Sequence, residues 1–196
     1  MALDFGASLP GGLVYQPGFL TSEEEAELLE AIGGLTLHEA TYKSYSAKRR
    51  TASFGSSYDF DRNELEPAPP LPQFLYPLRH KVAAWLGMRS DAFVHGLVTE
   101  YRAGTSLGWH RDVHQFGVVV GVSLAAPCRM RFRPYPPRGG RDPNTFALEL
   151  QPRSAYVLQG NIRWRWQHSI APTKALRYSI TLRTAAGDRR AGAPES

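Results

Sequence analysis

Two residues with metal-binding side chains, His110 and Asp112, are separated by a single residue and directly follow a segment with the composition of a β-strand. In an extended chain, residues two positions apart project to the same face, so this imidazole and this carboxylate can converge on one ion. A lone His-x-Asp pair is common in proteins and says little by itself. It becomes informative when a third ligand arrives from a distant part of the chain.

His168 can supply that third ligand. Residues 163–170 have the composition of a strand whose alternation places Trp164, Trp166 and His168 on one face, and if the tryptophans point into a β-barrel, so does the histidine. Two histidines and one carboxylate on one side of a metal leave three coordination positions open, as in non-haem iron(II) oxygenases. We therefore predict that His168 and the His-x-Asp pair together bind Fe(II).

The open positions need a cosubstrate and oxygen, and the last predicted strand, residues 177–183, has side chains that could hold such a cosubstrate. Arg177, Ser179, Thr181 and Arg183 share one face of that strand. A strand face with two inward arginines is costly to bury without anionic partners. A bidentate 2-oxo acid that is also a dicarboxylate, 2-oxoglutarate, is such a partner, because it pairs with cationic groups while chelating the metal.

The composition indicates one soluble domain with an anionic partner. The chain has 196 residues, a net charge of +5, and 19 arginines among its 23 basic residues, which favours phosphate-containing ligands. Its single cysteine, Cys128, excludes an internal disulfide, and we expect it to be a small buried residue of a strand. No apolar run approaches the roughly 20 residues that span a bilayer, so we expect a cytoplasmic protein without membrane contact.

The N-terminal half is expected to contain two supporting helices. Thr21 and Glu24 have the spacing of a capping box at the start of the first helix, which should end at the Gly33-Gly34 pair. The second should follow the proline cluster 67–72, with apolar residues from Leu75 to Leu86 at spacings of three and four.

Between these helices, residues 42–60 interleave basic and aromatic side chains with little helical periodicity. Such a segment suits single-stranded nucleic acid, because aromatic rings stack on bases and cations pair with phosphates. An outer hairpin whose aromatic residues pack on the core has equal weight on this segment alone.

From Phe93 onward the chain becomes a series of short β-rich runs separated by turn formers. We therefore predict a β-dominated α+β fold, with a jelly-roll (double-stranded β-helix) core at residues 93–184 and the helices and lid at 1–92, all in one domain. The small polar tail 185–196 is expected to be disordered. The predicted runs are 95–101, 118–124, 130–133, 145–150, 155–158, 163–170 and 177–183.

Three separate elements resemble the AlkB-type 2-oxoglutarate/iron dioxygenases: the segment 97–112 (LVTEYRAGTSLGWHRD), the isolated His168, and the segment 177–183 (RYSITLR). The resemblance runs in order from about Gly12 to Thr184 and is strongest from Leu97 onward. It implies the jelly-roll fold, Fe(II) as metal, and 2-oxoglutarate and O2 as cosubstrates.

Carried over by position, the resemblance also implies residue roles. The iron ligands would be His110, Asp112 and His168. The 2-oxoglutarate pocket would contain Thr99, Tyr101, Arg177, Ser179 and Arg183. A nucleotide-recognition lid and the pocket mouth would contribute Arg49, Arg50, Phe54, Tyr58 and His114 to substrate binding.

Three positions depart from the family pattern. Thr99 and Ser179 stand where the family often has asparagine, and both keep a hydroxyl that can hydrogen-bond. His114 stands two residues after the metal aspartate, where the repair enzyme that gave the family its name has an acidic residue, so a different base preference is expected. We expect His80 and His95 to be surface or hydrogen-bonded histidines, and Trp109 to be a packing residue.

Three functions follow from these features. The first is oxidative demethylation of N-alkylated bases in DNA or RNA, by a monomer that takes a single-stranded or flipped-out base. The second keeps the oxygenase chemistry but acts on a protein or small molecule, because fold and cosubstrate do not fix the substrate. The third is a nucleic-acid-binding module without catalysis, which the intact His-x-Asp and His168 set argues against.

Overall fold

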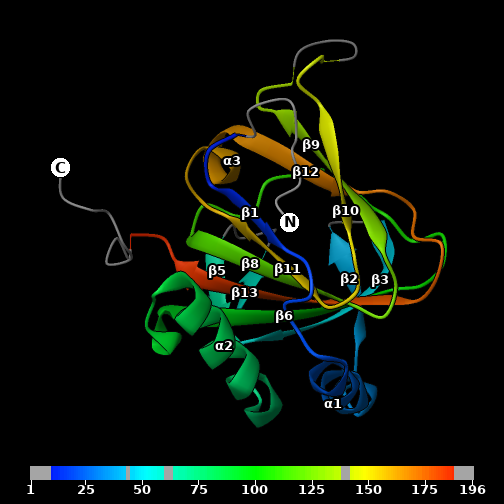
Figure 1. The fold of residues 1–196 in the computed structure, drawn as a ribbon, viewed down its shortest axis with the longest axis vertical. Coiled ribbons are helices and arrows are strands. Elements are labelled where there is room, and N and C mark those ends of the chain that lie inside the picture. The colour runs from blue at the N-terminus through cyan, green and yellow to red at the C-terminus, as the bar shows by residue number, and fades with distance from the viewer. Residues whose placement is uncertain (1–9, 43–44, 60–63, 138–141, 188–196) are drawn as a thin grey trace.

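The computed structural model describes residues 10–42, 45–59, 64–137 and 142–187, with the backbone alone for those that fall within 40–48 and 56–67. In this part of the chain the strands form two antiparallel sheets and a separate hairpin, with two longer helices beside the larger sheet (Figure 1). No helix in the described ranges is long and apolar enough to cross a membrane.

The major sheet has seven strands, and every pairing in it is antiparallel. In β13 and β6, the pairs Arg177–Tyr101 and Ser179–Thr99 lie directly opposite each other. In spatial order the strands are β1 (Leu13–Gln16), β11 (Ser154–Leu158), β8 (Phe116–Leu124), β13 (Arg177–Ala185), β6 (Phe93–Tyr101), β3 (Tyr45–Phe54) and β2 (His38–Tyr42).

The minor sheet packs against one face of the major sheet. Met130, Phe132 and Leu148 from the minor sheet share a buried cluster with Tyr101 and Leu158 from the major sheet, so this cluster fills the sandwich. The minor sheet, in order, is β10 (Phe146–Leu150), β9 (Cys128–Pro134), β12 (Trp166–Ile170) and β7 (Leu107–His110); β4 (Ser56–Asp59) and β5 (Glu64–Pro67) form the hairpin.

The helices cover the other face of the major sheet. A second buried cluster joins Leu28 and Ile32 of α1 (Ser22–Gly33) and Val82 of α2 (Tyr76–Leu86) to Val98 and Ile180 of the sheet. The predicted capping box is present, since the Thr21 hydroxyl accepts from the Glu24 amide and the Glu24 carboxylate accepts from the Thr21 amide. Together, helices, major sheet and minor sheet confirm the predicted β-dominated α+β fold.

One predicted strand, 163–170, is wrong in its first three residues. Residues 163–165 belong to a short helix, α3 (Gly160–Arg165), and only Trp166–Ile170 form a strand. Gly160 has a φ of 53°, which turns the chain into this helix, and the buried Arg163 guanidinium is bound by backbone carbonyls of residues 112–117. Trp164 is consequently 42% exposed and does not point into the sandwich, whereas Trp166 packs against the sandwich core as expected.

The structure agrees with the local predictions for Cys128 and His80. Cys128 is buried in β9 as a small core residue, and His80 is exposed on α2. The described part of the expected tail, 185–187, begins as the end of β13, and the remainder lies outside the described residues.

Candidate metal and cosubstrate site

The three predicted metal ligands lie together at one end of the sandwich. His110 ends β7, Asp112 follows in the next loop, and His168 lies on β12 directly opposite His110. One ligand atom from each residue lies within 4.8 Å of the others, and the two imidazole centroids are 4.2 Å apart. The antiparallel pairing of β7 and β12 therefore creates the cluster from residues 58 positions apart in sequence.

A hydrogen bond to the backbone orients the His110 ring. Its Nδ1 lies 2.9 Å from the Gly108 carbonyl oxygen, which can only accept, so Nδ1 carries the proton. The other nitrogen, Nε2, then has a free lone pair and is the one that can bind a metal. In metal-binding histidines generally, the tautomer is fixed by such a hydrogen bond from the ring nitrogen that does not bind the metal.

The two carboxylate oxygens of Asp112 have different surroundings. Oδ1 accepts hydrogen bonds from Nε and Nη2 of Arg183, at 2.8 and 2.6 Å. Oδ2 is buried, has no hydrogen-bond partner, and lies 3.5 Å from Nε2 of His168. A buried carboxylate oxygen without a donor is costly unless a ligand satisfies it, so Oδ2 fits a metal ion.

The protonation states of the three predicted ligands also suit metal binding. Burial alone would raise the pKa of Asp112, but the Arg183 guanidinium and the two imidazoles hold that pKa well below its usual range. Burial, and then the neighbouring His110, lower the pKa of His168 to about 3. Burial likewise lowers the pKa of His110. All three groups are therefore in the deprotonated forms that bind metals near neutral pH.

Arg183 is itself positioned by a histidine. Its Nη1 lies 3.1 Å from Nδ1 of His95, which is directly opposite on β6 and packs against Phe116 in a tilted arrangement, at 4.6 Å between ring centroids. Burial, followed by the charge of Arg183, lowers the pKa of His95 to about 3, so this imidazole is neutral and can accept from Arg183. His95 is thus a hydrogen-bonded histidine, as expected, but its link to the metal carboxylate was not foreseen.

Arg177 lies inside the sandwich with one donor group unused. Its side chain is 1% exposed, Nε donates to the Ser123 hydroxyl at 3.2 Å, and Nη1 has no partner. No carboxylate of the described residues forms an ion pair with it. A buried guanidinium in this condition fits a ligand carboxylate, because the ligand would supply both the charge and the missing acceptor.

The residues around Arg177 agree with a cosubstrate pocket. The centroid of the Tyr101 ring lies 5.0 Å from the Arg177 guanidinium carbon, and Ser179 is buried two residues farther along the same face of β13. Thr99, opposite Ser179, is buried on the same face of the sheet. The structure thus brings four predicted cosubstrate residues together and places Arg183 next to the metal carboxylate.

Tyr156 is a further residue of this pocket that sequence reasoning missed. Burial raises the pKa of its hydroxyl, while the charge of Arg177 opposes that shift. Its ring fills the space in which a side chain at Gly121 would lie, 2.2 Å from the ideal Cβ position. The glycine inside the valine-rich strand 118–122 was the available signal, because a mid-strand glycine often marks a close approach.

The predicted substrate residues are dispersed rather than gathered. Arg50 and Phe54 face the helices: Arg50 forms a bidentate ion pair with Glu100, and Phe54 is buried in the core between helices and sheet. Alternation along β3 explains this, since Arg49 has the opposite parity and is close enough to influence the pKa of Tyr101 and His110. Arg50 and Phe54 are thus held by structural contacts, while the side chain of Tyr58 lies outside the described residues.

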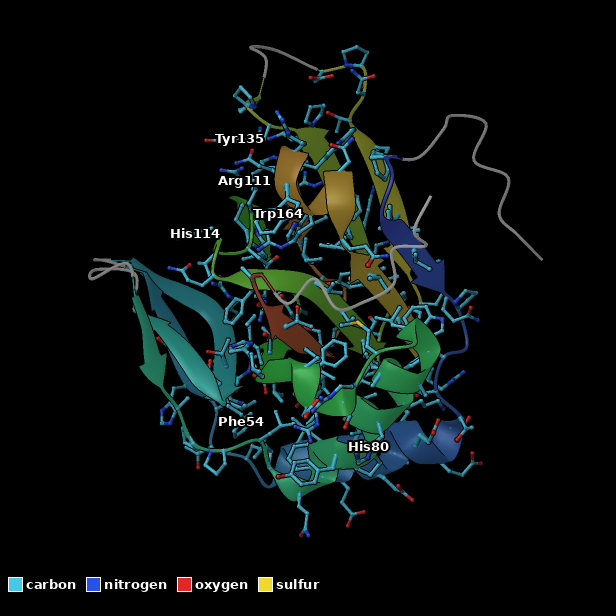
Figure 2. The ribbon with its side chains drawn as sticks, turned by 90° about the vertical axis from the view of Figure 1, so that its left-hand side faces the viewer. Phe54, His80, Arg111, His114, Tyr135 and Trp164 are labelled. Atoms are coloured by element: carbon cyan, nitrogen blue, oxygen red, sulfur yellow. The ribbon has the colours of Figure 1, made fainter. Side chains whose placement is uncertain are left out.

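His114 lines a cavity beside the metal carboxylate, as its position two residues after Asp112 suggested. The cavity has a volume of about 360 Å³. Figure 2 shows four of its residues, Tyr135, Arg111, Trp164 and His114, on the same side of the molecule, far from His80 and the helices α1 and α2. The full lining consists of Arg111, Asp112, Val113, His114, Tyr135, Arg163, Trp164 and Gln167.

Arg163 is the second positioning residue that was not foreseen. Its guanidinium donates to the carbonyls of Asp112, Val113, Phe116 and Gly117 at 2.7 to 3.2 Å. These four contacts hold the loop that carries the metal carboxylate against helix α3. No sequence spacing points to such a contact, because it joins a side chain to backbone atoms about 50 residues away.

Comparisons with known proteins agree with this site. The family model described as the 2OG-Fe(II) oxygenase superfamily matches residues 12–190. A protein of Arabidopsis thaliana named alkylated DNA repair protein ALKBH8 homolog is 28% identical over 189 residues, which is 86% of this chain and 53% of that protein. A protein of Mus musculus named tRNA (carboxymethyluridine(34)-5-O)-methyltransferase ALKBH8 is 26% identical over 174 residues, 85% of this chain and 25% of that protein.

The chain therefore spans about half, or less, of the length of these relatives. Among solved structures, OsALKBH1 superimposes with a TM-score of 0.64 at 15% identity, covering 91% of this chain and 98% of that one. This likeness confirms the jelly-roll fold that the sequence predicted.

Proposed function

Because the chain belongs to the 2OG-Fe(II) oxygenase superfamily, we propose that it removes N-alkyl groups from bases of nucleic acid by oxidative demethylation. Its cosubstrates are 2-oxoglutarate and O2, and its metal is Fe(II). The observation that carries the chemistry is the pair of buried, unpartnered atoms inside the sandwich, Oδ2 of Asp112 and Nη1 of Arg177. One fits a metal ion and the other a cosubstrate carboxylate.

The residues of the chain bind and orient the reactants. Bound iron, with 2-oxoglutarate and oxygen, supplies an oxidant for a substrate C–H bond, and 2-oxoglutarate leaves as succinate and carbon dioxide. His110, Asp112 and His168 would hold the metal, while Arg177, Tyr101 and Ser179 would hold the cosubstrate. Hydroxylation of an N-methyl carbon gives a hemiaminal, which breaks its C–N bond and releases formaldehyde and the unmodified base.

Two observations support nucleic acid as the substrate class. The cavity beside Asp112 combines exposed aromatic rings with arginines, which suits a base and its phosphate. In addition, the names of the two relatives refer to DNA repair and to tRNA. Methyl transfer, named for the mouse protein, is not carried over, because this chain covers a quarter of that protein.

The test measures succinate and formaldehyde together. Purified protein is supplied with Fe(II), ascorbate, 2-oxoglutarate and a panel of N-methylated single-stranded DNA and RNA oligonucleotides, with His110→Ala in parallel. We expect equal amounts of both products from wild type on at least one oligonucleotide, and neither from the variant. Succinate without formaldehyde from every oligonucleotide would contradict demethylation and direct the search to another substrate class.

A further inference from the structure

The outer face of the minor sheet carries a row of arginines and aromatic rings that the reaction does not use. In β9, Met130 and Phe132 point into the sandwich, so Arg131 and Arg133 point outward. Both guanidinium groups lie over the ring of Trp109, at 5.2 and 4.5 Å from its centroid. Trp109, expected to be a packing residue, therefore contacts two cations on this outer face.

The row continues from the sheet to the cavity beside the metal carboxylate. Tyr135 follows β9, and the guanidinium carbon of Arg111 lies 3.8 Å from its ring centroid. Nη1 of Arg111 donates to the Trp164 carbonyl at 3.1 Å, which links the row to α3. Tyr135 and Trp164 are 40% and 42% exposed, and both line the cavity, as does Arg111 (Figure 2).

The positive charge of this row is not neutralised within the described part of the chain. Nε of Arg131 donates to the Ser169 hydroxyl and Nε of Arg133 to the Gln167 side-chain carbonyl, and both partners are neutral. None of the ion pairs among the described residues includes Arg111, Arg131 or Arg133. Several uncompensated cations on one face favour an anionic partner.

We propose that these six residues form a binding track for single-stranded nucleic acid, which leads the strand across the minor sheet to the cavity beside Asp112. The arginines pair with phosphates and the exposed rings stack on bases. This proposal rests on the proposed function and names the surface that holds the nucleotides next to the reacting one. The track consists of Trp109, Arg111, Arg131, Arg133, Tyr135 and Trp164.

Single-stranded nucleic acid is favoured over other anions by the alternation of cations and rings. In a duplex the base faces are already stacked on each other, so exposed rings would find no base to contact. An acidic peptide would use the arginines but would leave Tyr135 and Trp164 without flat partners. Alternating charge and ring surface is the pattern that sequence-tolerant single-strand binding requires.

The charge component is tested by the salt dependence of binding. The fluorescence anisotropy of a labelled, unmodified oligonucleotide of 12 nucleotides, as DNA and as RNA, is measured over a salt series. Each phosphate contact contributes a slope of about 0.7 in log K against log salt for single strands. We expect Arg131→Gln/Arg133→Gln to lower the slope by about 1.4. Arg89→Gln/Lys174→Gln, which removes two exposed charges elsewhere, should leave it unchanged.

The stacking component is tested at the two exposed rings. We expect Tyr135→Ala and Trp164→Ala each to weaken binding by about fivefold or more at fixed salt, because stacking of one base on a ring is lost. Tyr135→Phe and Trp164→Phe keep an aromatic face and should bind like wild type. This conservative pair separates loss of stacking from loss of folding.

Three outcomes would overturn the track: unchanged salt slope and affinity in the charge and ring variants, equal weakening by the control variant, or displacement of the oligonucleotide by poly-glutamate of equal charge at equal concentration. Formaldehyde release by wild type is scored separately. Intact, variant-sensitive binding without formaldehyde would overturn the demethylation but leave the track in place. Formaldehyde release from the oligonucleotide, together with binding that none of the variants changes, would overturn the track but leave the demethylation in place.

Discussion

The two faces of the major sheet differ in how completely their polar groups are satisfied. On the helix side, Glu100 accepts hydrogen bonds from Arg50, Arg102 and Tyr178, so its charge is fully engaged within the protein. On the side facing the minor sheet, Arg177 is equally buried but keeps a donor without an acceptor. Neighbouring residues of β6 and β13 thus have opposite roles, depending only on the face that they occupy.

This difference shows how one sheet can provide both stability and a binding site. Strand alternation sends every second side chain to each face, so a single register places Glu100 with its partners and Tyr101 with Arg177. The satisfied face stabilises the fold without any ligand. The face with unsatisfied polar groups lowers the stability of the protein until a ligand binds. Substitutions that remove polar groups should therefore stabilise the ligand-free protein on this face and destabilise it on the other.

The largest effect is expected at the metal ligands. His168→Gln removes an imidazole that faces Oδ2 of Asp112, and we expect turnover to fall by about a thousandfold, roughly 4 kcal/mol of transition-state stabilisation. Oxygen uptake dependent on 2-oxoglutarate checks this result, and near-ultraviolet circular dichroism shows whether the fold is kept. Turnover within tenfold of wild type would remove His168 from the metal site.

The second largest effect is expected at Arg177. Arg177→Met removes the unpaired donor, so the KM for 2-oxoglutarate should rise about a hundredfold, as expected for losing a charge-assisted contact. Without ligands the variant should be about 1 kcal/mol more stable than wild type, because an unpaired buried cation is replaced by an apolar chain. Denaturant unfolding without metal or cosubstrate measures this. A loss of stability would show that the guanidinium is structural.

A smaller effect on turnover is expected at His95. His95→Leu deprives Arg183 of an acceptor and loosens its hold on Asp112, so we expect iron affinity to fall by about tenfold, in the range seen for residues that support metal ligands. Titration of the protein with Fe(II) under anaerobic conditions checks this. His95→Asn, which can still accept a hydrogen bond, serves as the matched control and should retain most of the affinity.

The smallest effect on turnover is expected at Glu100. Glu100→Gln weakens the contact with Arg50, which is about one-third exposed, so we expect a loss of about 1 to 2 kcal/mol in the free energy of unfolding. The KM for 2-oxoglutarate should stay within twofold of wild type. A hundredfold rise in that KM would show that the two faces of the sheet are not independent.

The stability difference at Glu100 should also depend on pH. The hydrogen bond from Arg50, followed by that residue's charge, lowers the pKa of Glu100 in the folded protein. The difference from Glu100→Gln should therefore be fully present above the ordinary pKa of 4.5, and should disappear as the pH falls through the lower pKa of the folded state. Urea unfolding of both proteins between pH 3 and pH 7 measures this difference.

The sequence was sufficient for the parts of the site that depend on local spacing. The two-residue interval between His110 and Asp112 and the alternation of residues 177–183 each follow from strand geometry, and the capping box of α1 is equally local. His168 lies in the predicted metal cluster although the first three of the eight residues in its predicted strand are helical, because β12 keeps the expected alternation from Trp166 onward.

The contacts that were missed all join distant parts of the chain. Arg163 binds backbone carbonyls across 46 to 51 residues, and Arg50 pairs with Glu100 across 50. Neither depends on a periodic pattern, because each is fixed by the register and packing of separate elements. Phe54 shows the same limit, since the composition of its segment is equally typical of a binding surface and of a packed strand.

The most direct test of the 2-oxoglutarate pocket at Arg177 is a calorimetric titration of 2-oxoglutarate into Fe(II)-loaded protein under anaerobic conditions. Wild type and Arg177→Met are compared. We predict one binding site per chain in wild type and at least tenfold weaker binding in the variant, because Nη1 of Arg177 is the buried donor that lacks an acceptor. Equal affinity in the two proteins would contradict the assignment of this pocket to 2-oxoglutarate.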